Sequence, residues 1–179
     1  MYPIVVDNFF EDPDSIRNYA LSLEYQNSNE LQNFEGWLGN RCFYRDEQFA
    51  KFFVNKINQH IEKSVEFHKL EYNFHFTLTK TKETSPFHFD EYKIHSDSDD
   101  GLYRLSGLVY LYPNPPIKTG TSFYSDLDLN YEFSVENKYN RFICYPSEIL
   151  HAPTDLFGEN KQNARLTLTF FVLADNPAG

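Results

Sequence analysis

The pattern of hydrophobic and polar positions predicts two helices in the first part of the chain. Asp12 followed by Pro13 is typical of a helix start, because the aspartate caps free backbone amides and proline fits the first helical turn. Apolar residues then recur at helical spacing and predict a first helix: Ile16, Tyr19, Ala20 and Leu23. A second helix is predicted to begin near Asp46, with one apolar face: Phe49, Phe52, Phe53, Ile57 and Ile61.

From residue 72 the repeat shortens to two, which is the period of a half-buried strand. In this segment the apolar residues at 72, 74, 76 and 78 alternate with polar ones at 73, 75, 77 and 79. Residues 26–45 are polar and have no regular pattern, so we predict an irregular segment there. Further strands are predicted over residues 3–6, 91–97, 104–112, 121–125, 139–145 and 164–173.

Several short strands that follow two helices, with no helices between the strands, favour an antiparallel sandwich or barrel over a parallel sheet. We therefore expect an α+β fold that is mainly β. The helical support covers about residues 11–68 and the β core about residues 70–175. No linker or repeat interrupts the chain, so residues 1–179 are expected to form a single domain.

Composition and charge narrow the classes of function. The 179 residues include 16 basic and 26 acidic ones, for a net charge of −10, which argues against a nucleic-acid partner because such proteins neutralise phosphates with Lys and Arg. An aromatic content of 18% argues against disorder. No apolar stretch approaches the ~18 residues of a membrane span, and the N-terminus does not resemble a signal peptide. The two cysteines, Cys42 and Cys144, are expected to be reduced thiols in a cytoplasmic protein.

The candidate chemistry begins with His95 and Asp97 at the end of a predicted strand. Residues two apart in a strand point to the same face, so both side chains can reach one ion, and His151 follows after a long gap. Two imidazoles and one carboxylate form a facial triad that leaves metal positions open, which suits non-haem Fe(II). His88 and Asp90 form a second pair with the same spacing, and an uninterrupted strand would place it on the opposite face.

Arg165 opens an alternating strand in which Thr167 and Thr169 share its face. An arginine on the inner face of a strand is costly unless a carboxylate meets it. No acidic residue of this strand lies on that face, so a bound carboxylate ligand is one candidate partner. The alternatives are an Arg165 that points to solvent from an edge strand, or one that pairs with a carboxylate elsewhere in the protein.

In order and spacing, these residues resemble the Fe(II)- and 2-oxoglutarate-dependent oxygenases, in their prolyl-hydroxylase-like branch. The resemblance extends over residues 92–171 and rests on these segments: His95-Ser96-Asp97, Ser106–Pro116, Gly120–Tyr124, His151 and Arg165-Leu166-Thr167. One departure is Tyr112, at a position where such enzymes often carry Asn. We prefer His95 and Asp97 to the upstream pair because they lie nearer the strand that contains Gly107 and Tyr110.

The resemblance implies a double-stranded β-helix (jelly-roll) core with the N-terminal helices packed on one sheet. It implies that His95, Asp97 and His151 are catalytic residues that bind Fe(II). It further implies that Arg165 binds the distal carboxylate of 2-oxoglutarate with help from Thr167, and that O2 is the second co-substrate. The reaction would be hydroxylation of a small-molecule or peptidyl substrate, with no nucleic acid or membrane as partner.

Two other classes of protein fit the same residues. The first is a non-catalytic jelly-roll that binds a ligand or has a structural role. The second is a cupin-like metal enzyme that does not use 2-oxoglutarate. Trp37 and Arg41 either belong to a lid over the site or are a packed tryptophan and a surface arginine. Neither the substrate nor the oligomeric state can be read from the sequence.

Overall fold

The computed structural model describes residues 2–28, 39–81, 94–98, 101–125 and 130–175. The first half of the chain carries the two helices and four strands: β1 (Ile4–Val6), α1 (Pro13–Ser22), β2 (Gln26–Asn27), β3 (Asn40–Cys42), α2 (Glu47–Ile57) and, after the short 3₁₀ helix η2 (Phe67–Lys69), β4 (Leu70–Thr77). The second half consists of strands: β5 (Tyr103–Tyr110), β6 (Thr121–Tyr124), β7 (Tyr131–Val135), β8 (Phe142–Pro146), β9 (His151–Pro153) and β10 (Arg165–Leu173).

Both predicted helices are present, and each begins at its predicted cap. The Asp12 carboxylate accepts a hydrogen bond from the Ser15 amide at 3.1 Å, and the Asp46 carboxylate accepts one from the Phe49 amide at 2.9 Å. These bonds satisfy amide groups that have no partner within the first turn of a helix. Local sequence therefore determines where the helices start.

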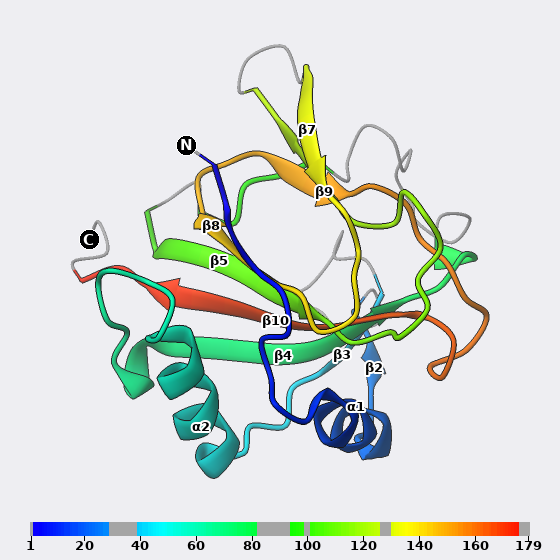
Figure 1. The fold of residues 1–179 in the computed structure, drawn as a ribbon, viewed down its shortest axis with the longest axis horizontal. Coiled ribbons are helices and arrows are strands. Elements are labelled where there is room, and N and C mark those ends of the chain that lie inside the picture. The colour runs from blue at the N-terminus through cyan, green and yellow to red at the C-terminus, as the bar shows by residue number, and fades with distance from the viewer. Residues whose placement is uncertain (1, 29–38, 82–93, 99–100, 126–129, 176–179) are drawn as a thin grey trace.

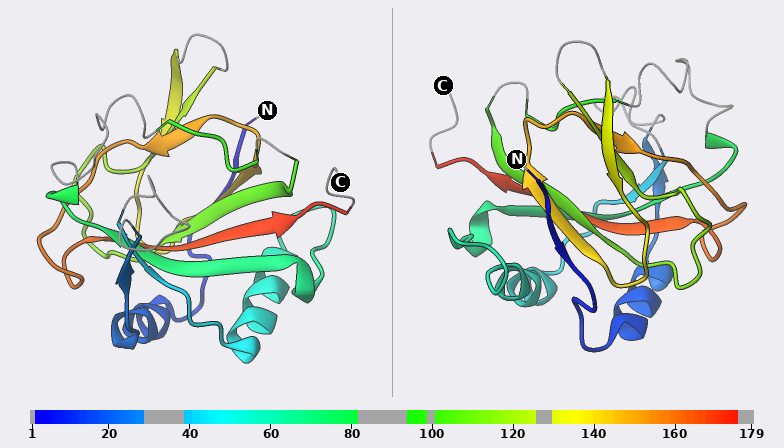
Figure 2. Two further views of the ribbon diagram at one scale, coloured as in Figure 1. Left: turned by 180° about the vertical axis from the view of Figure 1, so that it is seen from behind. Right: turned by 45° about the horizontal axis from the view of Figure 1, so that its top comes forward.

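The strands form two antiparallel sheets. The large sheet has seven strands in the order β1-β8-β5-β10-β4-β3-β2, and the small sheet has three in the order β7-β6-β9. Both helices lie on one side of the large sheet, and β7 and β9 lie on the other (Figures 1 and 2). The expectation of a mainly β protein with helices packed on one sheet is confirmed.

The large sheet has an apolar outer face towards the helices and a polar inner face towards the small sheet. On β10, Leu166, Leu168 and Phe170 belong to the core that also contains Phe53 of α2, whose ring lies 5.6 Å from that of Phe170. Arg165, Thr167 and Thr169 alternate with them and face inward, as the period of two predicts. A smaller apolar cluster lies between the sheets: Leu108, Tyr110, Phe123, Val135, Ile143 and Tyr145.

Some strand predictions need correction. Residues 26–45, predicted to be irregular, contain β2 and β3, which pair with each other and, through β3, with β4. The prediction over 139–145 starts too early, because Asn140 has a φ of 61° and its side-chain amide bonds to the backbone of Phe10, so β8 begins at Phe142. In the predicted strand 91–97, the described residues 94–97 contain an isolated bridge at His95. β7 and β9 were not predicted.

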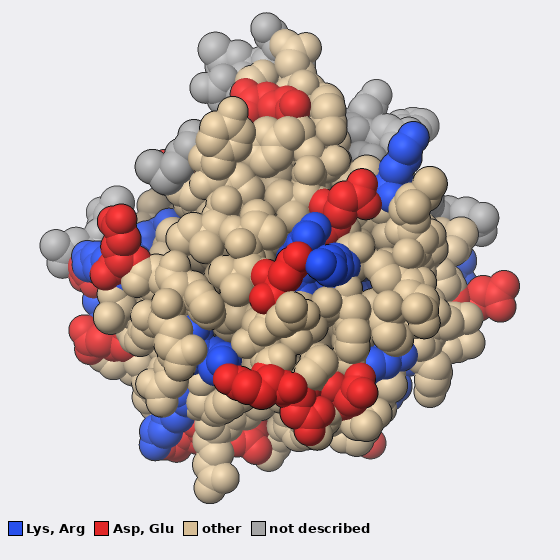
Figure 3. Space-filling model, viewed as in Figure 1, with Lys and Arg blue, Asp and Glu red and all other residues tan. Residues whose placement is uncertain are grey.

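On the face shown in Figure 3, acidic and basic side chains lie in mixed groups. At one end of the β1–β8 strand pair, Asp7 forms ion pairs with Arg141 at 2.6 Å and with Lys138 at 2.7 Å. Neither α-helix in the described part of the chain has the length and apolar character needed to span a membrane.

Candidate metal centre

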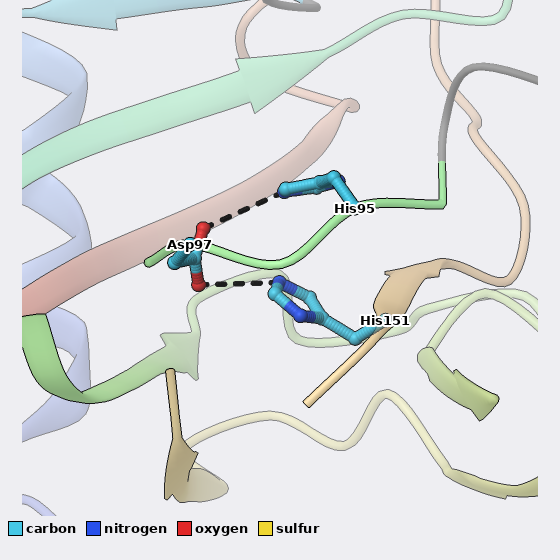
Figure 4. A group of neighbouring side chains, drawn as sticks. All are labelled: His95, Asp97 and His151. Atoms are coloured by element: carbon cyan, nitrogen blue, oxygen red, sulfur yellow. Dashed lines mark ion pairs between the residues drawn. The ribbon is translucent and has the colours of Figure 1, made fainter. Parts of the chain in front are cut away.

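His95, Asp97 and His151 lie together at one end of the inner face (Figure 4). His95 forms a β-bridge with His151, in which each backbone amide donates to the other residue's carbonyl at 3.0 and 2.9 Å. The Asp97 amide donates to the Ser147 carbonyl at 2.8 Å. These backbone bonds hold a short segment before β5 against the start of β9, which explains how residues far apart in sequence meet.

The side chains of these three residues converge. The Asp97 carboxylate lies 3.5 Å from Nε2 of His95 and 3.3 Å from Nε2 of His151. The His151 Nδ1 atom lies 2.9 Å from the Ile149 carbonyl, so Nδ1 carries the proton and the lone pair of Nε2 points towards Asp97. The His151 side chain is buried and that of Asp97 is 11% exposed, whereas the His95 side chain is 51% exposed. The centre is therefore closed on one side and open on the other.

Burial and charge set the protonation states of the centre. Burial lowers the pKa of His151 to about 4, although the charge of Asp97 acts in the opposite direction. Burial alone would raise the pKa of Asp97, but the charge of His151 and the hydrogen bond and charge of His95 outweigh it and hold that pKa below its usual value. At neutral pH the site therefore offers a neutral imidazole and an ionised carboxylate, which are the forms that bind a metal.

This group of side chains fits a divalent metal. One ligand atom from each residue lies within 4.8 Å of the other two, and the donor set is two imidazoles and one carboxylate. Such a set suits non-haem iron and leaves positions open for other ligands. The alternative pair, His88 and Asp90, lies outside the described residues. The structure thus brings together the three residues that the sequence predicts as ligands.

Arg165 lies deep on the inner face, at the start of the central strand β10. Its Nε donates to the Thr119 carbonyl at 3.0 Å, and its Nη2 donates to the Gly120 carbonyl at 3.2 Å and to Oγ1 of Thr121 at 3.4 Å. Only 4% of its surface is exposed, and it forms no ion pair with any described residue. Burial lowers the pKa of this guanidinium, and the nearby Tyr110 opposes that effect. Arg165 therefore neither points to solvent nor pairs with a described carboxylate.

The surroundings of Arg165 are buried and rich in hydroxyl groups. The guanidinium lies over the ring of Tyr110, 5.4 Å from its centroid, and the Tyr110 hydroxyl lies 2.7 Å from Oγ1 of Thr121. Thr167 is fully buried on the same face of β10, where its hydroxyl lies 3.4 Å from the His75 carbonyl and 3.3 Å from the Thr169 hydroxyl. A buried cation with adjacent hydroxyls is a typical site for a carboxylate.

Sequence reasoning missed a residue beside the metal centre, on the inner face of the large sheet. Tyr145 of β8 is buried between the sheets, its ring 4.7 Å from that of His151 and 5.1 Å from that of Phe123. The Tyr145 hydroxyl forms no hydrogen bond with a described residue. The charges of Asp97 and Arg165 both act on its pKa, which burial raises well above the usual value. The available signal was its place at the end of the predicted strand 139–145, directly before Pro146.

The chain is similar to known proteins in structure but not in sequence. No protein-family model matches the chain, and no curated protein matches it in sequence. Solved structures do match. A prolyl-4-hydroxylase from Pseudomonas putida superposes with a TM-score of 0.60 at 17% identity, over 96% of this chain and 92% of that one. The chain has the fold of the 2OG-Fe(II) oxygenases.

Two further structures extend this comparison. An oxidoreductase of the 2OG-Fe(II) oxygenase family from Burkholderia pseudomallei has a TM-score of 0.63 at 10% identity, over 98% of this chain and 86% of that one. The non-heme alpha ketoglutarate dependent epimerase SnoN from nogalamycin biosynthesis has a TM-score of 0.59 at 12% identity, over 96% of this chain and 78% of that one. At these identities the likeness establishes the fold.

Proposed function

We propose that the protein is an Fe(II)- and 2-oxoglutarate-dependent dioxygenase. One observation carries the proposal: the inner face of a 2OG-Fe(II) oxygenase fold holds a His–Asp–His group at one end and the buried cation Arg165 on the same face. The first fits a divalent metal and the second fits a carboxylate. We also propose that the two facing sheets form a double-stranded β-helix, which the order of their strands supports.

The proposed roles follow from the contacts. His95, Asp97 and His151 would hold the metal, and the bond from His151 Nδ1 to the Ile149 carbonyl would keep that imidazole in its binding orientation. Arg165 would bind the distal carboxylate of 2-oxoglutarate, because its Nε and one Nη are already fixed by Thr119 and Gly120 and the guanidinium therefore needs no reordering. Thr167 would add a hydroxyl beside it.

Bound Fe(II) would supply the redox chemistry by which O2 converts 2-oxoglutarate to succinate and CO2, while the second oxygen atom of O2 enters a C–H bond of the substrate. The protein's own contribution is to position and to exclude water. Tyr110, Phe123 and Tyr145 are buried between the sheets and line the space around the site with aromatic rings. Such walls shield a reactive centre from solvent and strengthen the interaction of Arg165 with an anion.

We propose hydroxylation of a small-molecule or peptidyl substrate in the cytoplasm. SnoN has the same fold and is an alpha ketoglutarate dependent epimerase, so product analysis must accompany any assay of co-substrate use. A hydroxylated product is heavier than its substrate by one oxygen atom, whereas an epimer has the mass of the substrate. Mass spectrometry separates the two outcomes.

The test is aerobic incubation of the Fe(II)-loaded protein with 2-oxoglutarate and measurement of retained iron and of succinate. We expect retained iron and slow succinate formation in the wild type, and neither in Asp97→Asn. A protein that retains no iron would instead be a non-catalytic binding or structural protein. Retained iron without succinate, at any substrate tested, would indicate a cupin-like metal enzyme that does not use 2-oxoglutarate.

A further inference from the structure

A second arginine reaches the inner face from the edge of the large sheet. Arg41 of β3 is in register with His75 of β4, which is itself in register with Thr167 of β10. Gly39, two residues earlier, leaves room for the His75 ring, since a side chain at Gly39 would begin 2.6 Å from Nε2 of His75. β3 therefore packs closely on β4 and carries Arg41 to the wall of the site.

The guanidinium of Arg41 is oriented towards the metal end of that wall. Its Nη1 donates to Oδ1 of Asn73 at 3.1 Å. Asn73 lies opposite Thr169, which is the next inward-facing residue after Thr167 towards the C-terminal end of β10. Burial lowers the pKa of Arg41 to about 10, and the charge of Asp97 acts against that effect. Arg41 thus lies within the electrostatic reach of a metal ligand, on a different strand from Arg165.

The electrostatics of the loaded site favour an anion at Arg41. A divalent cation at the triad would offset the charge of Asp97 and would face the guanidinium as a second positive centre. An anionic group between the two would reduce that repulsion. Arg165 lies at the start of β10 and Arg41 lies on β3, so one oxo acid bound to the metal and to Arg165 and a second anion at Arg41 would contact different strands.

We propose that Arg41, oriented by Asn73, binds a carboxylate of the substrate beside the metal centre, so that the substrate is a carboxylic acid. The fork of a guanidinium matches the two oxygens of a carboxylate, and the amide of Asn73 fixes the plane of that fork. This inference rests on the proposed function, because it places the acid next to bound metal and 2-oxoglutarate. It makes Arg41 a residue that determines substrate specificity.

The experiment uses the full chain with Mn(II) and N-oxalylglycine, an unreactive analogue of 2-oxoglutarate. The probes are the common L-amino acids, each as the free acid and as its carboxamide, together with phosphoserine amide as a phosphate that lacks a carboxylate. Calorimetric titration measures each dissociation constant. We expect at least one acid to bind about tenfold or more tightly than its amide, since hydrogen bonds to charged groups carry this much discrimination.

Variants then assign that preference to Arg41. Arg41→Met should weaken binding of the preferred acid about 10- to 100-fold and leave its amide and N-oxalylglycine within about twofold. Arg41→Lys should retain part of the preference, because it keeps the charge and loses the fork. Arg45→Met is the matched control, because Arg45 is an exposed arginine four residues further along the chain. Its loss should change neither the dissociation constant of the acid nor that of its amide.

Several results would overturn the proposal, and one further result would overturn the proposed function instead. Equal binding of acids and amides by the wild type, or preference for the phosphate, would exclude a carboxylate substrate. Loss of N-oxalylglycine binding in Arg41→Met would place Arg41 in the co-substrate site instead. If N-oxalylglycine does not bind the wild type at all while an acid still binds through Arg41, the proposed function fails and the assignment of Arg41 as a carboxylate-binding residue stands.

Discussion

Replacing Arg165 with methionine separates the binding role of this residue from its structural role. The guanidinium could form two charge-assisted bonds with a carboxylate, each contributing about 1.5–3 kcal/mol. Their loss, about 3–6 kcal/mol, should weaken 2-oxoglutarate binding about 10²- to 10⁴-fold. The change also removes the bonds to Thr119 and Gly120, so stability should fall by about 1–3 kcal/mol.

Arg17 is a matched control for this prediction. It also donates to two backbone carbonyls, of Leu111 at 2.8 Å and Gln162 at 2.7 Å, and it also lies over a tyrosine ring, that of Tyr112 at 5.3 Å. Arg17 belongs to α1, on the helical side of the large sheet. Arg17→Met should lower stability in a similar way and leave 2-oxoglutarate binding within about twofold.

The assay is calorimetric titration of Mn(II)-loaded protein with 2-oxoglutarate, and urea unfolding gives the stability. The reasoning predicts a large binding loss in Arg165→Met alone. It is refuted if Arg165→Met binds 2-oxoglutarate as the wild type does. It is also refuted if both variants weaken binding equally, because the effect would then follow from lost stability.

Three more predictions concern the metal, the core and the thiols. Asp97→Asn should reduce iron retained after desalting to background, measured by elemental analysis, and retention at the wild-type level would remove Asp97 from the ligand set. Phe53→Ala should lower the free energy of unfolding in urea by about 3–5 kcal/mol, because Phe53 is fully buried against Phe9 and Phe170; Phe52→Ala, at a 41% exposed position, should cost much less. Burial raises the pKa of Cys144 to about 12, so in the folded protein this thiol stays protonated at pH 8 and should react with iodoacetamide only after unfolding; rapid labelling of Cys144 in the folded protein would contradict its buried position.

The parts of the fold that were predictable are those determined by local sequence. Asp12 and Asp46 cap their helices with the side-chain bonds that their positions imply. β4 and β10 each have one face in the apolar core and a polar inner face, so their residues alternate visibly. The inward direction of Arg165 follows from the same alternation, and the structure places it as that pattern predicts.

The parts that were missed depend on tertiary pairing. β3 has the sequence Asn40-Arg41-Cys42, in which the inward residue is a charged one, and its strand form comes from pairing with β4 rather than from any apolar pattern. The bridge between His95 and His151 joins segments distant in sequence and is invisible to local patterns. Trp37 lies outside the described residues, so both alternatives for it, a place in a lid and a packed tryptophan, stay open.

The central claim is that the inner face binds Fe(II) and 2-oxoglutarate together. The most direct measurement is an anaerobic titration of the protein with 2-oxoglutarate, with and without Fe(II), followed by visible absorption. We predict a weak charge-transfer band that requires both Fe(II) and 2-oxoglutarate and saturates at one 2-oxoglutarate per chain. The band should be absent from Asp97→Asn and from Arg165→Met at the 2-oxoglutarate concentration that saturates the wild type. A wild-type protein that gives no such band, or one that Asp97→Asn leaves unchanged, would contradict the account.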